Sequence, residues 1–198
     1  MNGTIKTSML TIASLLAFCA TGASAAMGDG DSLELLRKIA PSAVVVEYTL
    51  QYDEGQTAHE HLVADERPLE KGGMLLTSRM VISADPLIDP RFVKEIHVRR
   101  GDDRIPAKPI AYARDNAAVY LEMDGEFETA VPLEFDPTAK RPYSTITMNK
   151  RDGRWILQDT SMTTTPTMTL DGGEFLTSTS DAIVVNNDGV PVGMMFEG

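Results

Sequence analysis

Cysteine, histidine and positive charge are all scarce in this chain of 198 residues. Cys19 is the only cysteine and lies in an apolar N-terminal run, so a disulfide framework is excluded. If that run is removed as a leader, thiol nucleophiles and thiolate metal sites are excluded as well. The 29 acidic residues outnumber the 18 basic ones, and the net charge of −11 disfavours binding to nucleic acid or anionic lipid.

The N-terminal segment has the pattern of a secretory signal peptide. Lys6 is the only charged residue before Asp29, an apolar run follows at 9–20, and small residues at 23–26 supply an A-x-A-like cleavage site. The run is shorter than the roughly 20 apolar residues of a transmembrane helix. We expect export to the periplasm or the extracellular space without a stable membrane anchor. Lipid attachment at Cys19 is a weaker alternative, because a small residue is preferred where bulky Phe18 stands.

The remaining sequence is dominated by short strand patterns. A helix is predicted at 33–39, with Ser32 as its cap and Pro41 ending it. Apolar and polar residues alternate from Ala43, which predicts a half-buried strand. Further short apolar runs, separated by glycine and aspartate turns, follow at 74–76, 80–84, 94–99, 105–113, 117–123, 143–148, 155–158, 162–170, 175–177, 182–185 and 190–196. Repeated short strands with little helix predict an all-β pair of barrels or a sandwich.

Four segments, in the same order, resemble the bacterial HtrA-type trypsin-like serine proteases. Residues 36–46 (LRKIAPSAVVV) are similar to the family's short helix that runs through Pro-Ser into its first strand. Residues 72–84 are similar to its glycine-led hairpin before the catalytic histidine. Residues 101–121 look like the block that carries its aspartate, and 184–193 (VVNNDGVPVG) like the strand pair after its nucleophile. The resemblance implies an all-β, trypsin-like double β-barrel.

The resemblance also sets the expected domain organisation. Residues 1–26 form the signal peptide, 27–42 a linker with a short helix, 43–136 the first β-barrel and 137–198 the second. Members of the family continue past this last strand, often into a PDZ domain, whereas this chain stops at Gly198. We therefore expect a second barrel that is either trimmed or completed by a partner. Its open edge can take a strand from another protein, a peptide or a second copy of the chain.

The same alignment predicts that the catalytic triad is lost. The histidine position falls on Pro86, which cannot accept a proton, and no histidine lies between 62 and 96. The aspartate position falls on Asn116, and Asp115 beside it would point to the opposite face of a strand. At the nucleophile position Ser180 is kept, but the family's glycines around it are not, which weakens the oxyanion hole. Because a serine needs an adjacent base, these residues predict an inactive protein that binds protein or peptide and acts in scaffolding or regulation.

Two alternatives to this hypothesis stay open. Ser180 could belong to an active serine endopeptidase with a rearranged dyad, which requires a lysine or histidine nitrogen within about 3.2 Å of its hydroxyl. The chain could instead be a purely structural envelope protein.

His59 and His61 form a weak candidate metal site. In an extended segment the two imidazoles would share one face, with further ligands available from Asp53, Glu54, Asp65 and Glu66. Because such pairs in acidic loops are usually solvated, we predict no metal and no cofactor. His97 lies in an alternating strand pattern and is predicted to face solvent.

Overall fold

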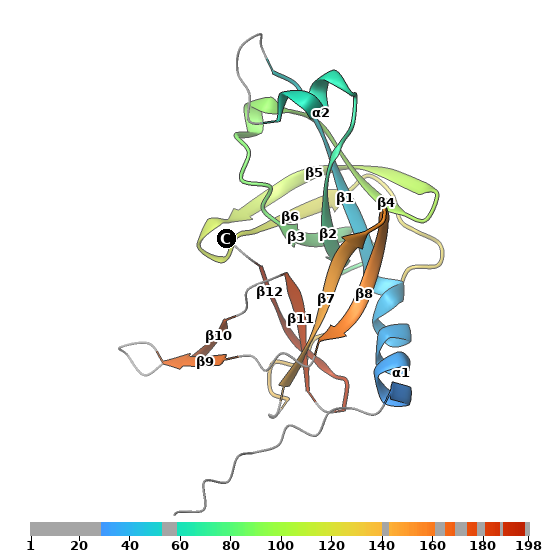
Figure 1. Cartoon of the computed structure of the whole chain (residues 1–198), viewed down its shortest axis with the longest axis vertical. Coiled ribbons are helices and arrows are strands. Elements are labelled where there is room, and N and C mark those ends of the chain that lie inside the picture. The colour runs from blue at the N-terminus through green and yellow to red at the C-terminus, as the bar shows by residue number, and fades with distance from the viewer. Residues whose placement is uncertain are drawn as a thin grey trace, which may run out of the picture.

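The protein is built mostly from β-strands, as the sequence predicts. The computed structural model describes residues 29–52, 59–139, 143–160, 165–168, 174–177, 181–186 and 188–196. The predicted signal peptide and Ser180 lie outside these residues. Two β-units stack end to end, with a helix beside the second one (Figure 1). Among the described helices, none is long and apolar enough to cross a membrane.

Six antiparallel strands close into a barrel at one end of the molecule (Figure 1). In chain order they are β1 (Ala43–Leu50), β2 (Leu69–Leu75), β3 (Met80–Ala84), β4 (Val93–Arg100), β5 (Asp103–Ala113) and β6 (Ala118–Met123). Their spatial order is β1–β2–β3–β6–β5–β4, closed by the pairing of β4 with β1. Inward residues such as Val46, Val81, Val98 and Leu121 are fully buried and fill the interior. Closure pairs both edges of each of these strands.

Strand β1 is covered on both faces, whereas the alternating pattern predicts a half-buried strand. Its inward residues Val46 and Tyr48 pack in the barrel interior. On the outer face Val45 and Glu47 are also buried. The outer cover includes arginine side chains from β4 and β5, which pair with Glu47. Because this cover comes from other strands, the alternation within β1 could not reveal it.

The N-terminal helix α1 (Asp29–Ile39) begins earlier than predicted. Ser32 is the fourth residue of the helix and therefore does not cap it, and its hydroxyl donates a 2.6 Å hydrogen bond to Asp159 Oδ2 of the second unit. Pro41 lies in the short 3-10 helix η1 (Ala40–Ser42), where its missing N–H costs nothing. The chain passes from η1 directly into β1.

The second unit is an open four-stranded sheet in the order β12–β11–β7–β8. Its strands are β7 (Tyr143–Arg151), β8 (Arg154–Thr160), β11 (Ala182–Asn186) and β12 (Pro191–Met195), while β9 (Thr165–Met168) and β10 (Glu174–Thr177) form a separate pair. Within the described residues this sheet does not close, so β8 and β12 each keep an edge without a neighbouring strand. The all-β prediction is therefore confirmed, and the described strands of the second unit form an open sheet.

One apolar cluster joins the barrel, the second sheet and α1. Its most buried members come from all three parts of the molecule: Leu35, Ile39, Met74, Ile146, Ile183 and Val185. Gly72 of β2 permits the close approach of the second sheet, because a Cβ atom there would lie only 3.1 Å from the sulfur of Met148. Both sides of the contact thus depend on each other for burial.

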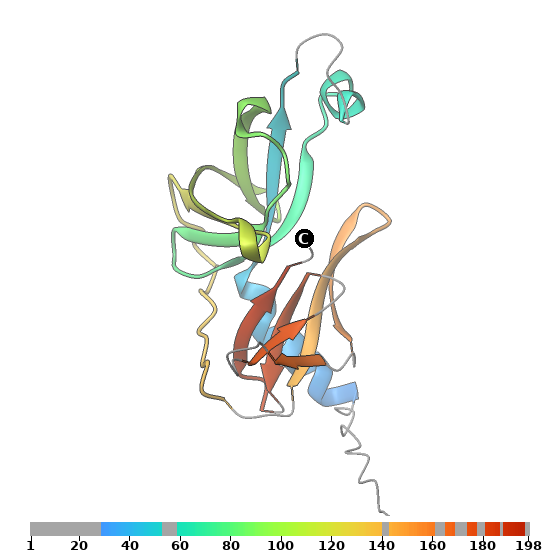
Figure 2. The same cartoon turned by 90° about the vertical axis from the view of Figure 1, so that its left-hand side faces the viewer.

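The segment that connects the two units, which we call the linker strap (residues 124–139), is bonded to both of them (Figure 2). The N–H of Leu133 donates to the carbonyl of Leu75 on β2, and the N–H of Asp136 donates to the carbonyl of Pro191 on β12, each at 2.8 Å. The strap therefore ties the barrel to the second sheet along one side of the molecule.

Candidate functional site

The positions that the resemblance assigns to the histidine and the aspartate lie in neighbouring loops. Pro86 follows β3 by two residues and is half-buried, and Asn116 is exposed at the end of the 3-10 turn η3 (Arg114–Asn116). The N–H of Asp85 donates to the carbonyl of Ala117 at 2.8 Å, which ties the two loops together. The structure thus brings two of the three predicted positions to the same end of the barrel.

The third position, Ser180, lies outside the described residues. Its neighbour Asp181 lines a narrow cavity between the barrel and the second sheet, opposite Gly72 and Gly73 of β2. The cavity measures about 20 Å³, which is room for about one water molecule. The two units are therefore packed closely at the point where β11 begins.

Neither loop of the candidate site supplies an imidazole. Residues 85–92 and 113–118 contain no histidine, and the chain's three histidines lie on β4 and around α2 (Glu60–Ala64). Asp85 is buried, but its Oδ1 accepts the N–H of Leu87 at 2.9 Å, a local bond that shapes the loop. A serine hydroxyl placed here would find no histidine on either loop to accept its proton.

A pocket of about 410 Å³, which we call the barrel-mouth pocket, opens beside these loops. Asp85, Leu87, Tyr112 and Arg114 contribute to its wall. Leu87 has a φ of 56° and is 71% exposed, so a strained backbone presents an apolar side chain here. Burial, and then the Asp85 carboxylate, raise the pKa of Tyr112, which stays protonated at neutral pH. The pocket therefore offers hydrogen-bond donors from a phenol and a guanidinium beside the carboxylates of Asp85 and Asp89.

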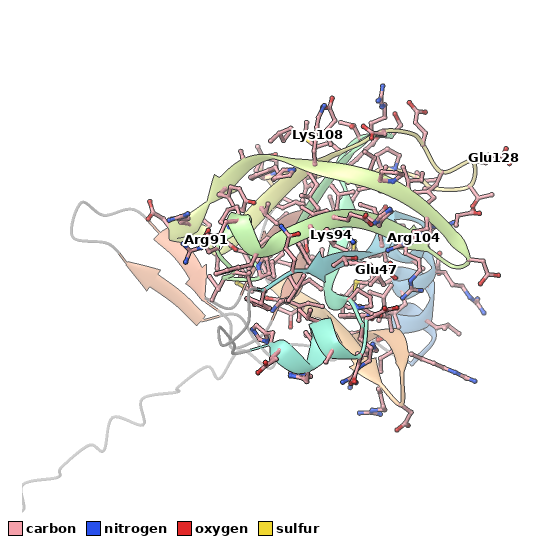
Figure 3. All side chains as sticks on the ribbon, turned by 90° about the horizontal axis from the view of Figure 1, so that it is seen from above. Glu47, Arg91, Lys94, Arg104, Lys108 and Glu128 are labelled. Atoms are coloured by element: carbon pink, nitrogen blue, oxygen red, sulfur yellow. The ribbon has the colours of Figure 1, made fainter. Side chains whose placement is uncertain are left out.

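The sequence reasoning missed a charge cluster on the outer face of the barrel. Glu47 is buried, and its two carboxylate oxygens accept hydrogen bonds from the Nε atoms of Arg99 and Arg104. The Glu47–Arg104 distance is 2.8 Å, and Figure 3 shows these two side chains next to each other. The one sequence signal for this cluster is a glutamate directly after three valines, in the strand AVVVEYTL.

A second glutamate joins the barrel to the hairpin of β7 and β8. Glu70 Oε2 accepts hydrogen bonds from Lys150 Nζ at 2.8 Å and from the indole N–H of Trp155 at 2.7 Å. Burial opposes the ionisation of Glu70, but these hydrogen bonds and the charges of Lys150 and Arg99 outweigh it and lower its pKa below the ordinary 4.5. Glu70 is thus an ionised bridge between the two units at neutral pH.

A concavity of about 620 Å³ lies beside this bridge. We call it the arginine groove. It runs between α1, the start of β1, the end of β4 and the strand β8, and four arginines contribute to its wall: Arg37, Arg99, Arg100 and Arg154. No carboxylate is among the described residues that line it. The groove was not predicted from the sequence, because its lining comes from segments far apart in the chain.

The extended geometry expected for His59 and His61 is wrong. His61 lies in the helix α2 and His59 stands at its start, with the two ring centres 6.4 Å apart. Asp53 and Glu54 lie outside the described residues, and Asp65 pairs with Arg67 at 2.6 Å. Among the residues that the structure describes, no three potential metal-ligating side chains come together.

The prediction that His97 faces solvent is also wrong. His97 lies opposite Glu47 of β1 and Pro106 of β5, and it is half-buried. Its Nδ1 atom is shielded from solvent and has no hydrogen-bond partner among the described residues. The neighbouring strands and their side chains cover this part of the outer face, which the sequence of β4 alone does not show.

Comparison with solved structures identifies the fold. The crystal structure of the Rv3671c protease from M. tuberculosis, in its active form, superposes with a TM-score of 0.52, at 13% identity over 82% of this chain and 72% of that one. The HtrA-type protease AlgW with a tripeptide gives a TM-score of 0.57, at 10% identity over 82% of this chain and 53% of its own. The fold is trypsin-like.

At these identities the likeness concerns the trypsin-like fold alone. This chain spans about half the length of AlgW. No protein-family model and no curated protein sequence matches it. The trypsin-like architecture implied by the sequence resemblance is confirmed, whereas the assignment of Pro86, Asn116 and Ser180 to the triad positions stays a prediction.

Proposed function

We propose that this chain is an exported, catalytically inactive trypsin-like protein that binds protein or peptide segments. The observation that carries the proposal is Pro86, which follows β3 in the loop bonded to the Asn116 loop. In the active relatives that the sequence resembles, this loop carries the histidine that accepts the serine's proton. Proline has no side-chain acceptor, and neither loop offers an imidazole in its place.

The missing proton acceptor determines how much catalytic activity is lost. A serine protease that lacks a triad member keeps at most about 10³- to 10⁴-fold catalysis over water, and an intact oxyanion hole supplies much of this remaining activity. Residues 178–183 (STSDAI) lack the glycines that would shape this hole in the family. An activity that has lost both contributions would be close to the uncatalysed rate.

Two features support a binding role in place of catalysis. The barrel-mouth pocket supplies hydrogen-bond donors from Tyr112 and Arg114 beside the loops that carry Pro86 and Asn116. The second sheet has edges at β8 and β12 without a neighbouring strand among the described residues, and such edges accept added strands from partners.

Labelling of the purified chain with a fluorophosphonate probe tests the loss of activity. We expect no labelling and no hydrolysis of fluorogenic casein, with Ser180→Ala indistinguishable from the natural chain and trypsin as the positive control. Labelling that disappears in Ser180→Ala would establish the rearranged dyad instead.

Export has a separate test. The protein recovered from the periplasm or medium of its producing cell is expected to begin after Ala25 or Ala26, as shown by N-terminal sequencing. A chain that keeps Met1 and stays in the cytoplasm would contradict this part of the proposal.

A further inference from the structure

The arginine groove has an unpaired strand edge as one wall. The consecutive residues 153–157 all line it. Because neighbouring residues of a strand point to opposite faces, such an unbroken run borders a space where the strand presents its backbone edge. Strand β7 occupies the other edge of β8, and the described residues provide no hydrogen-bond partner for the outward backbone groups of 154–157. This stretch can therefore pair with another strand.

Helix α1 leaves this stretch of β8 open. Figure 1 shows the helix running alongside the strand. The hydrogen bond between Ser32 and Asp159 fastens α1 to the far end of β8. Farther along the helix, Arg37 and Ala40 line the groove opposite 153–157. The groove is thus bordered by the helix on one side and by a strand edge on the other.

The charges that line the groove are all positive. Arg99 is paired with Glu47, and Arg100 makes a hydrogen bond to a threonine hydroxyl. Arg37 and Arg154 are exposed and make no ion pair with any residue that the structure describes. Two or three guanidinium groups are therefore available to an anionic partner in a chain whose net charge is −11.

Acidic residues stand at the rim of the groove and do not line it. Asp102 and Asp103 lie at the turn between β4 and β5, and Asp152 lies in the turn between β7 and β8, all exposed to solvent. Their charges are hydrated and screened, as are those of the exposed Arg37 and Arg154, so they weaken the positive field of the groove.

Between the charges the groove is apolar. Val45 is only 6% exposed, and Leu36, Trp155 and Leu157 are half-buried around the same space. The volume of about 620 Å³ lies within the range of about 300 to 1,000 Å³ that is usual for ligand sites. An occupant therefore meets an apolar floor, a row of backbone polar groups and positive charge.

We propose that the arginine groove binds an extended acidic peptide segment of a partner protein, which adds to β8 as a fifth strand of the second sheet. Apolar residues at alternate positions pack against Val45 and Leu157, and acidic residues pair with Arg37 and Arg154. A hydrocarbon chain would cover the floor but leave the strand edge unpaired, which disfavours a lipid. The inference names the partner class and the surface for the proposed binding role, and it rests on that role.

Fluorescence anisotropy with the full chain tests the proposal. The probe is a fluorescein-labelled peptide of sequence Val-Glu-Leu-Glu-Val-Glu. We expect saturable binding that weakens between 0.1 and 1 M NaCl, because the screening length falls from about 10 Å to about 3 Å. The same peptide with lysine in place of glutamate is expected not to bind. Equal binding of both peptides would overturn the proposal.

Charge reversal in the groove locates the site. The double variant Arg37→Glu/Arg154→Glu is expected to weaken binding by about tenfold or more. Lys94→Glu/Lys108→Glu is the matched control, because it changes the net charge equally and neither residue lines the arginine groove or the barrel-mouth pocket. Equal weakening by the control variant would overturn the assignment to this groove. Circular dichroism verifies the fold of each variant, and Arg37→Gln/Arg154→Gln serves if charge reversal unfolds the chain.

N-methylation of the probe tests strand pairing. Methyl groups on the amides of the odd or of the even positions remove hydrogen-bond donors from one edge of the extended peptide or the other. One of the two methylated peptides is expected to lose binding and the other to keep it, because a single peptide edge faces β8. Retention of binding by both would overturn the fifth-strand arrangement.

These measurements separate the inference from the proposed function. Fluorophosphonate labelling at Ser180 would end the inactive assignment and leave the peptide result standing. A chain that is neither labelled nor binds the probe would overturn the inference alone. Sedimentation that shows a dimer broken by Arg37→Glu/Arg154→Glu would overturn it as well, because a second copy would then occupy the groove.

Discussion

The barrel and the second sheet are made of similar short antiparallel strands, but they differ in whether the strand edges are paired. In the barrel, the pairing of β4 with β1 closes the ring and satisfies both edges of each strand. In the second sheet, β8 and β12 end the described order and keep one edge each. Closure, more than strand composition, thus decides where this molecule can take a partner.

The two units also differ in how they bury their cores. The barrel encloses an apolar cluster of its own, which includes Val46 and Leu121. The second sheet buries Ile146 and Ile183 in a cluster shared with α1, the outside of the barrel and the linker strap. Changes inside the barrel should therefore cost the most stability, and changes at the contact between the units should cost less.

Leu121→Ala tests the contribution of the barrel core and has the largest expected effect on stability. The side chain is fully buried, so its loss leaves a cavity and lowers the free energy of unfolding by about 3 kcal/mol. Urea unfolding followed by circular dichroism measures this change. Leu87→Ala is the control, with an expected change within about 0.5 kcal/mol because that side chain is 71% exposed. Equal losses from the two variants would contradict the barrel core described here.

Glu47→Ala removes the carboxylate that two arginines share. We expect a loss of about 2 kcal/mol, less than for a fully buried ion pair, because Arg99 and Arg104 are partly exposed and can be hydrated. The same urea titration applies. Glu122→Ala, which breaks the exposed pair with Lys108, is the control and should cost less than about 1 kcal/mol. A Glu47 variant as stable as the control would argue against the buried cluster.

Gly72→Ala probes the contact between the units directly. The added Cβ atom would lie 3.1 Å from Met148 Sδ, so we expect a loss of about 1 kcal/mol. Met148→Ala makes room for it, and the double variant should therefore lose less than the sum of the two single variants. Gly125→Ala is the control, since its Cβ atom would meet Ile105 at an ordinary 3.5 Å. Strict additivity of the two changes would show that the units do not touch at this point.

The smallest expected effect is a pH dependence of the bridge between the units. The pKa of Glu70 is lower in the folded protein than its ordinary 4.5, so its stabilisation is complete above that pH and is lost as the pH falls through the folded value. Trp155 is the only tryptophan and donates to Glu70, so its fluorescence should change in this acidic range. Glu70→Gln should remove that change without altering the spectrum at neutral pH. An identical acid titration in both proteins would exclude the bridge as its cause.

Much of the fold could be predicted because strands carry local signals. Alternating apolar residues and glycine or aspartate turns located most barrel strands to within about two residues, as for β3 at 80–84, whereas β2 begins five residues before the run predicted at 74–76. The misassigned residues depend on distant partners. Ser32 bonds to Asp159, 127 positions away, and Glu47 is covered by arginines more than 50 positions away. The local sequence around Ser32 or Glu47 does not show which distant residues each one contacts.

The candidate site was accessible to sequence reasoning only in part. The loops of Pro86 and Asn116 follow strands that the resemblance had already aligned, so their adjacency was implied. The arginine groove is formed by α1, β1, β4 and β8, and no spacing of residues in the sequence predicts it. Sites of this kind emerge only once the units are packed together.

The linker strap has a consequence for motion. Its bonds to Leu75 in the barrel and to Pro191 in the second sheet would both have to break before the halves could swing apart about a hinge. Together with the apolar cluster that the two units share, these bonds favour a fixed separation of the two halves. We therefore expect a binding partner to use openings that the unbound protein already has, such as the arginine groove.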